Sequence, residues 1–283
     1  MINKEILKNI KLVVFDLDGT LLDEYDTIGK ETIRLIDELK KLGVRFSLAS
    51  GRLLNAITYH AETLGLTTPI ISLDGALIRS YPEKNIIHES YIKEKYVNKV
   101  LDLTDKYLLN VALCHGKAIY YTENNSVIPK LIEKYGAKFQ QVDSYQKYAK
   151  KTLEIIITGD HKKSVQEVIK KTEFPYSFGL TNSFYKSHHH DSVYYLEIRN
   201  RGNSKGEGLK LLAKHLKVKI NETAVLGDWY NDKSLFETNA LKIAVANAVQ
   251  EIKDLSDYVL EKTNNEDAAA EFLQMVFEAK KSK

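Results

Sequence analysis

Short apolar runs alternate with longer segments of helical periodicity through the first third of the chain, and this alternation strongly constrains the fold. Lys11–Phe15, Val44–Ala49 and Ile70–Leu73 are short and apolar, which is typical of buried strands. Between the first two runs, apolar residues recur every three or four positions from Thr32 to Leu42, and Gly43 is a natural helix end. This β-α-β-α-β order predicts a parallel sheet covered by helices.

The pattern changes in the middle of the chain and then returns. Strand-like and helix-like pieces follow each other irregularly over residues 83–192, so we expect an inserted α+β domain there. Residues 1–82 and 193–283 should form the α/β core, a Rossmann-like parallel sheet with helices on both faces. Further expected core elements are the strands Tyr194–Ile198, Ala224–Leu226 and Ile243–Val245 and the helices Lys205–Leu216, Asp232–Glu237 and Asp267–Ala279. In the inserted domain we expect the strands Ala118–Thr122 and Leu153–Thr158 and the helices Lys93–Leu103 and Lys162–Lys171.

Composition and charge exclude several classes of protein. The 283 residues are 43% hydrophobic and 28% charged, which argues against a disordered or collagen-like chain. A formal net charge of +3 is too small to indicate a nucleic-acid-binding or acidic-lipid-binding surface. The single cysteine, Cys114, cannot close an internal disulfide, and we expect it to be a buried small apolar residue. Without a membrane-length apolar run or a signal-peptide core, the protein should be soluble and cytoplasmic.

Polar residues or glycine directly follow the predicted strands, where parallel sheets bind their ligands, and a lysine opens a predicted helix. These residues are Asp16 and Asp18 after the first strand, Ser50 and Gly51 after the second, Lys205 at a helix start, and Asp228, Asn231 and Asp232 after Ala224–Leu226. Asp16 and Asp18 are two positions apart, so in an extended segment their side chains point to the same side. Up to four carboxylates in one site would be neutralised by a hard, oxygen-binding cation such as Mg²⁺.

Other interpretations of these carboxylates are weaker. An isolated Asp-x-Asp is most often a helix cap or a turn. A calcium loop is excluded because Leu21 and Thr27 stand where that loop requires Gly and Glu. Neither a Walker phosphate loop nor a Rossmann glycine fingerprint occurs. The conjunction of several polar clusters at one predicted edge favours the functional interpretation.

The histidines at 188–190 make a poor chelate, because neighbouring strand residues face opposite ways, and we expect an exposed turn.

Taken together, the clusters resemble the four ordered motifs of the haloacid dehalogenase superfamily. The motifs are Asp16-Leu17-Asp18-Gly19-Thr20, Ser50-Gly51-Arg52, the Lys205 of Asn203-Ser204-Lys205-Gly206, and Gly227-Asp228-x-x-Asn231-Asp232. The insertion after the third strand is similar to the cap of the Cof-type subfamily. This resemblance implies a Mg²⁺-dependent phosphatase acting on small phosphorylated metabolites, with sugar phosphates as the first guess. Asp74 stands where the subfamily usually has Asn, and an extra carboxylate beside a phosphate site is electrostatically awkward.

The resemblance also implies a role for each motif residue. Asp16 would attack phosphorus and form an aspartyl-phosphate, while Asp18 would protonate the leaving group and then activate water. Mg²⁺ would be held by Asp16, the backbone carbonyl of Asp18, and Asp228, with Asp232 in support. The phosphate oxygens would be met by the residues Leu17, through its amide, Ser50, Gly51, Lys205 and Asn231.

Two alternative functions stay open on the same scaffold. In a phosphotransferase or phosphomutase, a second hydroxyl would replace water as the acceptor. A phosphometabolite-binding regulatory protein would keep the motifs without turnover. In each case the partner is a small phosphorylated metabolite rather than a nucleic acid or a membrane, and the inserted domain would choose it. We expect a monomer or a homodimer.

Overall fold

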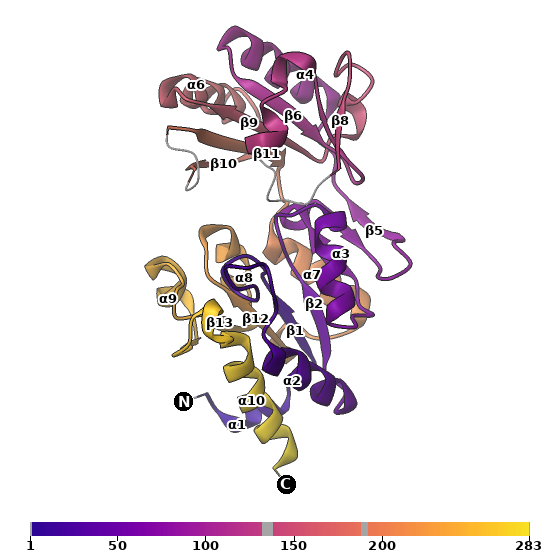
Figure 1. The fold of residues 1–283 in the computed structure, drawn as a ribbon, viewed down its shortest axis with the longest axis vertical. Coiled ribbons are helices and arrows are strands. Elements are labelled where there is room, and N and C mark those ends of the chain that lie inside the picture. Colours follow the sequence, from indigo (N-terminus) through magenta and orange to yellow (C-terminus); the bar gives the residue numbers. More distant parts are fainter. Residues whose placement is uncertain (1, 132–137, 188–191, 283) are drawn as a thin grey trace. The chain divides into compact units, whose positions relative to one another are not determined.

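The computed structural model describes residues 2–131, 138–187 and 192–282, and the histidines at 188–190 lie outside this part. The chain forms two compact units, which Figure 1 shows as ribbons. The first unit comprises Met1–Gly51, Ile57–Ile87 and Ser204–Lys283. The second comprises Arg52–Ala56 and His88–Asn203.

The first unit is built on a five-stranded sheet whose paired strands all run parallel, in the order β14-β13-β12-β1-β2. The strands are β1 (Leu12–Phe15), β2 (Arg45–Leu48), β12 (Thr223–Gly227), β13 (Leu241–Ala244) and β14 (Tyr258–Val259). Strand β1 lies between β12 and β2, and all four of its residues are buried, as expected of a strand covered on both faces. The predicted α/β class with a parallel core is therefore confirmed.

The helices of the first unit pack in two groups around this sheet. One group contains α1 (Lys4–Lys8), α2 (Lys30–Lys41) and α10 (Ala268–Lys281), and the other contains α7 (Lys205–Leu216), α8 (Lys233–Phe236) and α9 (Gln250–Leu255). Helix α3 (Leu54–Thr63) follows β2. Helix α2 shows why these segments pack as helices, because its apolar residues Leu35, Ile36 and Leu39 form one buried face. Gly43, at φ +83°, follows the end of this helix.

The third predicted strand belongs to a separate small sheet. Strand β3 (Ile70–Ser72) pairs antiparallel with β4 (Leu77–Arg79), and β5 (Ile86–Glu89) completes the three strands. An isolated parallel bridge between Ala49 and Ile71 joins β3 to the chain just beyond β2. The carboxyl end of β3 therefore lies beside that of β2.

The second unit is an α+β unit with a six-stranded sheet, in the order β10-β11-β9-β6-β7-β8. Its strands are β6 (Asn110–Cys114), β7 (Ile119–Tyr121), β8 (Phe139–Gln141), β9 (Glu154–Gly159), β10 (Leu180–Lys186) and β11 (Tyr194–Asn200). Its helices are α4 (Glu94–Lys106), α5 (Ile128–Leu131) and α6 (Lys162–Thr172). Side chains of α4 and α6, including Val97 and Val165, form one core with Ile155 and Leu196 from the sheet. Cys114 is fully buried, as expected.

One predicted core strand was placed in the wrong sheet. Strand β11 pairs antiparallel with β9 and β10 in the second unit, rather than parallel in the first. Its alternating residues Leu196 and Ile198 face the core of the second unit, and a strand pattern does not specify which sheet receives it. The second unit consequently extends to Asn203 instead of ending at residue 192.

Candidate active site

The candidate site begins where β1 and β12 end. Phe15 lies opposite Leu226 in the parallel register, and the backbone N–H of Asp16 continues the ladder by donating to Leu226 O at 3.0 Å. Asp228 directly follows β12. The register therefore brings Asp16 and Asp228 to the same edge of the sheet, as the sequence predicted.

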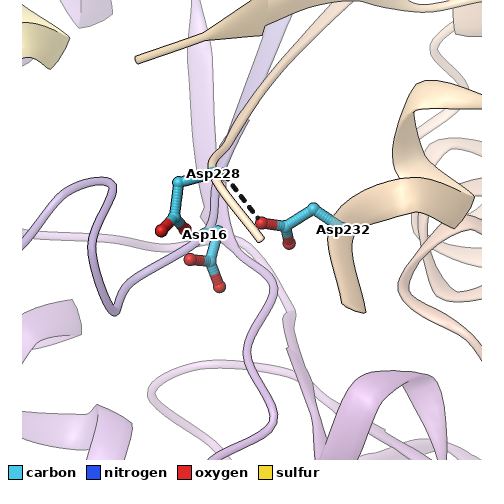
Figure 2. A group of neighbouring side chains, drawn as sticks. All are labelled: Asp16, Asp228 and Asp232. Atoms are coloured by element: carbon cyan, nitrogen blue, oxygen red, sulfur yellow. Dashed lines mark hydrogen bonds between the residues drawn. The ribbon is translucent and has the colours of Figure 1, made fainter. Parts of the chain in front are cut away.

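Three carboxylates come together at this edge (Figure 2). Ligand oxygens of Asp16, Asp228 and Asp232 lie within 4.8 Å of one another. The exposed fractions of these residues are only 3%, 7% and 0%. The backbone N–H groups of Asp228 and Trp229 donate to Asp232 Oδ2 at 3.0 and 3.2 Å, which fixes this carboxylate against the turn after β12.

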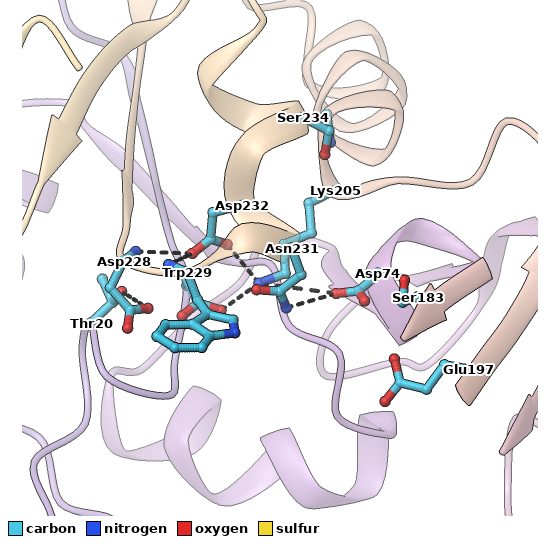
Figure 3. A network of polar contacts seen from close by, with 12 residues as sticks. Thr20, Asp74, Ser183, Glu197, Lys205, Asp228, Trp229, Asn231, Asp232 and Ser234 are labelled. Carbon is cyan, nitrogen blue, oxygen red and sulfur yellow. Dashed lines mark hydrogen bonds and ion pairs between the residues drawn. The ribbon is translucent and has the colours of Figure 1, made fainter. Parts of the chain in front are cut away.

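Lys205 supplies the positive charge of the cluster. It is the first residue of α7, whose N-cap Ser204 accepts a hydrogen bond from the Glu207 N–H at 3.2 Å. The fully buried Lys205 Nζ donates to Asp16 Oδ1 at 2.6 Å. It also donates to Asp232 Oδ1 at 2.7 Å (Figure 3). Both oxygens of Asp232 thus accept hydrogen bonds from protein donors, so this residue is better suited to orient the other groups of a cation site than to bind the cation directly.

The charges of the cluster do not balance. Burial, with repulsion from Asp232, raises the pKa of Asp228 to about 7. The same two causes raise the pKa of Asp16, against the attraction of Lys205. Burial alone would lower the pKa of Lys205, but the neighbouring carboxylates outweigh it and raise that pKa. When ionised, Asp16, Asp228 and Asp232 exceed the Lys205 ammonium by two negative charges. A further carboxylate, Asp74, lies 4.0 Å from the same ammonium.

This donor set fits a hard divalent cation. Carboxylate oxygens are the preferred protein ligands of such ions, and two added positive charges would offset much of this negative charge. Asp16 and Asp228 are the residues best placed to hold the ion, because Asp232 is engaged by Lys205 and two backbone N–H groups.

The turn after Asp16 differs from the extended segment expected. The Leu17 carbonyl accepts from the N–H groups of Thr20, Leu21 and Leu22, so the chain curls back. Asp18 is exposed and lies outside the buried carboxylate cluster. Its charge nevertheless contributes to the raised pKa values of Asp16 and Asp228.

The same turn contains two features that the sequence analysis gave no role. The Thr20 hydroxyl donates to Asp228 Oδ1 at 3.0 Å. Gly19 has φ +78°, and a Cβ there would lie 2.4 Å from Asp228 Oδ2, so glycine makes room for this carboxylate. A hydroxyl and a glycine inside an acidic motif were the available signals, but their partner is distant in the sequence.

The remaining predicted residues lie around this cluster. Ser50 is buried, and its N–H donates to Ile71 O at 3.0 Å. The Asn231 Nδ2 donates to Asp74 Oδ1 at 3.4 Å, and this carboxylate also lies beside Gly51. The phosphate contacts expected of the Leu17 amide, Ser50, Gly51, Lys205 and Asn231 stay predictions.

A family model for haloacid dehalogenase-like hydrolases matches residues 13–273 of this chain. The chain belongs to this family. The hydrolase is 28% identical over 285 residues to phosphatase YwpJ of Bacillus subtilis (strain 168), covering 94% of this chain and 99% of the relative. It is 24% identical to 5-amino-6-(5-phospho-D-ribitylamino)uracil phosphatase YcsE of the same organism, covering 94% and 95%.

Solved structures agree with this assignment. A haloacid dehalogenase-like hydrolase from B. subtilis matches the hydrolase with a TM-score of 0.79 and 26% identity, over 94% of this chain and 99% of the other. In the part of the chain that the structure describes, no helix has the length and apolar character needed to cross a membrane.

Proposed function

We propose that the protein is a Mg²⁺-dependent phosphatase that hydrolyses small phosphorylated metabolites, with sugar phosphates as the first candidates. The observation that supports this most directly is the Lys205 ammonium bonded to Asp16 within a buried group of three carboxylates. Such a site combines a nucleophile, a fixed cation and oxygen ligands for a divalent ion, which are the needs of phosphoryl transfer. The phosphatase names of the relatives support the same reaction.

In the proposed reaction, the Asp16 carboxylate attacks phosphorus and the ester oxygen leaves with a proton from Asp18. Water, activated by Asp18, then releases phosphate from the aspartyl-phosphate. When bound, Mg²⁺ neutralises charge on the phosphoryl oxygens. Lys205 holds Asp16 in place at 2.6 Å, and its three N–H donors allow contact with a phosphoryl oxygen as well. The exposed position of Asp18 leaves it accessible to a leaving group.

The second unit would serve as a cap that selects the substrate. This assignment rests on its position as an insertion and on the Cof-type resemblance. The name of YcsE describes a substrate with phosphate on a ribityl chain, which supports testing phosphorylated sugars and sugar alcohols first.

The test is phosphate release from a panel of phosphorylated metabolites, measured with Mg²⁺ and with a chelator. Asp16→Asn should lower kcat at least about a thousandfold while the protein stays folded, because an amide cannot form the aspartyl-phosphate. Asp37→Asn is the matched control: it removes one carboxylate from the exposed face of α2 and should leave kcat unchanged. Wild-type rates in Asp16→Asn would refute the assignment of Asp16 as the nucleophile. Release of inorganic phosphate without an added acceptor alcohol would distinguish hydrolysis from phosphoryl transfer.

A further inference from the structure

A strained turn lies beside the carboxylate cluster, between β3 and β4. Leu73, Asp74 and Gly75 have φ values of +48°, +46° and +93° in succession. Two consecutive non-glycine residues in this left-handed region are unfavourable, and such strain persists only where the surroundings impose it. At Gly75, a Cβ would lie 2.3 Å from Ser204 O, so the turn is pressed against the start of α7.

The turn places one more carboxylate at the site. Asp74 is only 6% exposed, and its backbone N–H donates to Ser50 O at 3.1 Å. Its Oδ1 lies 4.0 Å from Lys205 Nζ and accepts a hydrogen bond from Asn231 Nδ2 at 3.4 Å (Figure 3). A Cβ built on Gly51 would lie 3.3 Å from the same oxygen.

Asp74 therefore lies among residues proposed to bind phosphate: Gly51, Lys205 and Asn231. A fixed negative charge there competes with a phosphoryl dianion for the Lys205 ammonium and the Asn231 amide. It also repels the dianion directly, because like charges interact strongly in a buried site. The hydrogen bond from Asn231 and the burial of Asp74 hold this carboxylate at the site, and the surroundings impose the left-handed turn that carries it.

We propose that Asp74 limits the affinity of the phosphoryl site for phosphate dianions and so promotes the release of inorganic phosphate. This inference rests on the proposed function for the position of the phosphoryl group. Weaker binding of phosphate in the ester and in the product raises KM and relieves product inhibition together, because the interaction is the same in both.

The variant Asp74→Asn tests the charge with little change of shape. Asparagine tolerates the left-handed region at least as well as aspartate, and its amide oxygen can still accept from Asn231. Thermal unfolding should therefore match the wild type. Asp37→Asn removes the same charge from an exposed position on α2 and serves as the matched control.

The measurement is the dissociation constant of inorganic phosphate in the presence of Mg²⁺, by titration calorimetry, which needs no turnover. We expect Asp74→Asn to bind phosphate about tenfold more tightly than the wild type, with a parallel fall in KM, while Asp37→Asn stays within about twofold. An unchanged or weaker affinity in folded Asp74→Asn would overturn the inference, even if the wild type hydrolyses esters. Tighter binding in a protein that hydrolyses no ester would support the inference and refute the proposed phosphatase activity.

Discussion

At the scale of single residues, the site is organised around a shortage of positive charge. Lys205 satisfies Asp16 and Asp232 directly, and Asp228 receives a hydrogen bond from the neutral Thr20 hydroxyl. Burial and the repulsion of Asp232 raise the pKa of Asp228 to about 7, so the ionisation of this carboxylate changes near neutral pH. A proton and the proposed Mg²⁺ would therefore compete for the same oxygens.

This competition predicts the pH dependence of cation binding. The pKa of Asp228 is raised in the fold, so its contribution to stability is complete below the ordinary value of 3.8 and is lost as the pH rises towards about 7. Since Mg²⁺ requires the ionised form, the melting temperature in Mg²⁺ minus that in chelator should be small at about pH 5.5 and reach several degrees by about pH 8. Equal differences across this range would contradict the prediction, and Asp228→Asn should show little difference at any pH.

At the scale of elements, the site is made by turns rather than by the strands themselves. The parallel strands end at one edge of the sheet, and the turns that follow them orient side chains towards the carboxylate cluster. The turn at residues 17–22 can approach Asp228 only because Gly19 has no side chain. The turn at residues 73–75 brings Asp74 Oδ1 to 4.0 Å from Lys205 Nζ.

Gly19 and Gly43 have similar φ values but different surroundings, so substituting each one distinguishes the effect of backbone strain from that of steric crowding. Gly43, at φ +83°, has open space around it, whereas a Cβ at Gly19 would contact Asp228. We expect Gly43→Ala to reduce the free energy of unfolding by about 1–2 kcal/mol and to keep the thermal shift that Mg²⁺ binding is proposed to cause. Gly19→Ala should cost more and should abolish the shift, because Asp228 must move. Urea unfolding and thermal shifts check this, and a normal Mg²⁺ response in Gly19→Ala would contradict it.

At the scale of the whole molecule, the two units differ in how continuous they are in the sequence. The second unit has its own apolar core between its sheet and the helices α4 and α6, including Val100, Val168 and Ile157. Its main segment, His88–Asn203, is continuous in the sequence. The first unit must instead join segments that lie on either side of this insertion.

A fragment of residues 88–203 should therefore fold alone. We expect cooperative thermal unfolding by circular dichroism and dispersed amide signals by nuclear magnetic resonance, since the core of this unit is formed almost entirely within the fragment. A fragment ending at residue 192 is the control: it lacks β11, which pairs with both β9 and β10, and should be unfolded. Lack of cooperative unfolding in the longer fragment would show that the second unit depends on the first.

The sequence alone was sufficient to predict the features that depend on local patterns. The short apolar run before Asp16, the helix start at Lys205 and the polar residues after Leu226 each follow from residues close together in the chain. The parallel order then implied that these positions meet at one edge. Their proposed roles in catalysis came from the family resemblance.

Only the tertiary structure decided the features that depend on distant partners. The Lys205–Asp16 bond joins residues 189 positions apart, and the Thr20–Asp228 bond joins residues 208 apart. Likewise, the sheet that receives β11 and the position of Asp74 are set by long-range pairing and by packing against α7. Periodicity and propensity describe neighbours along the chain, whereas these contacts exist only after separate segments have packed together.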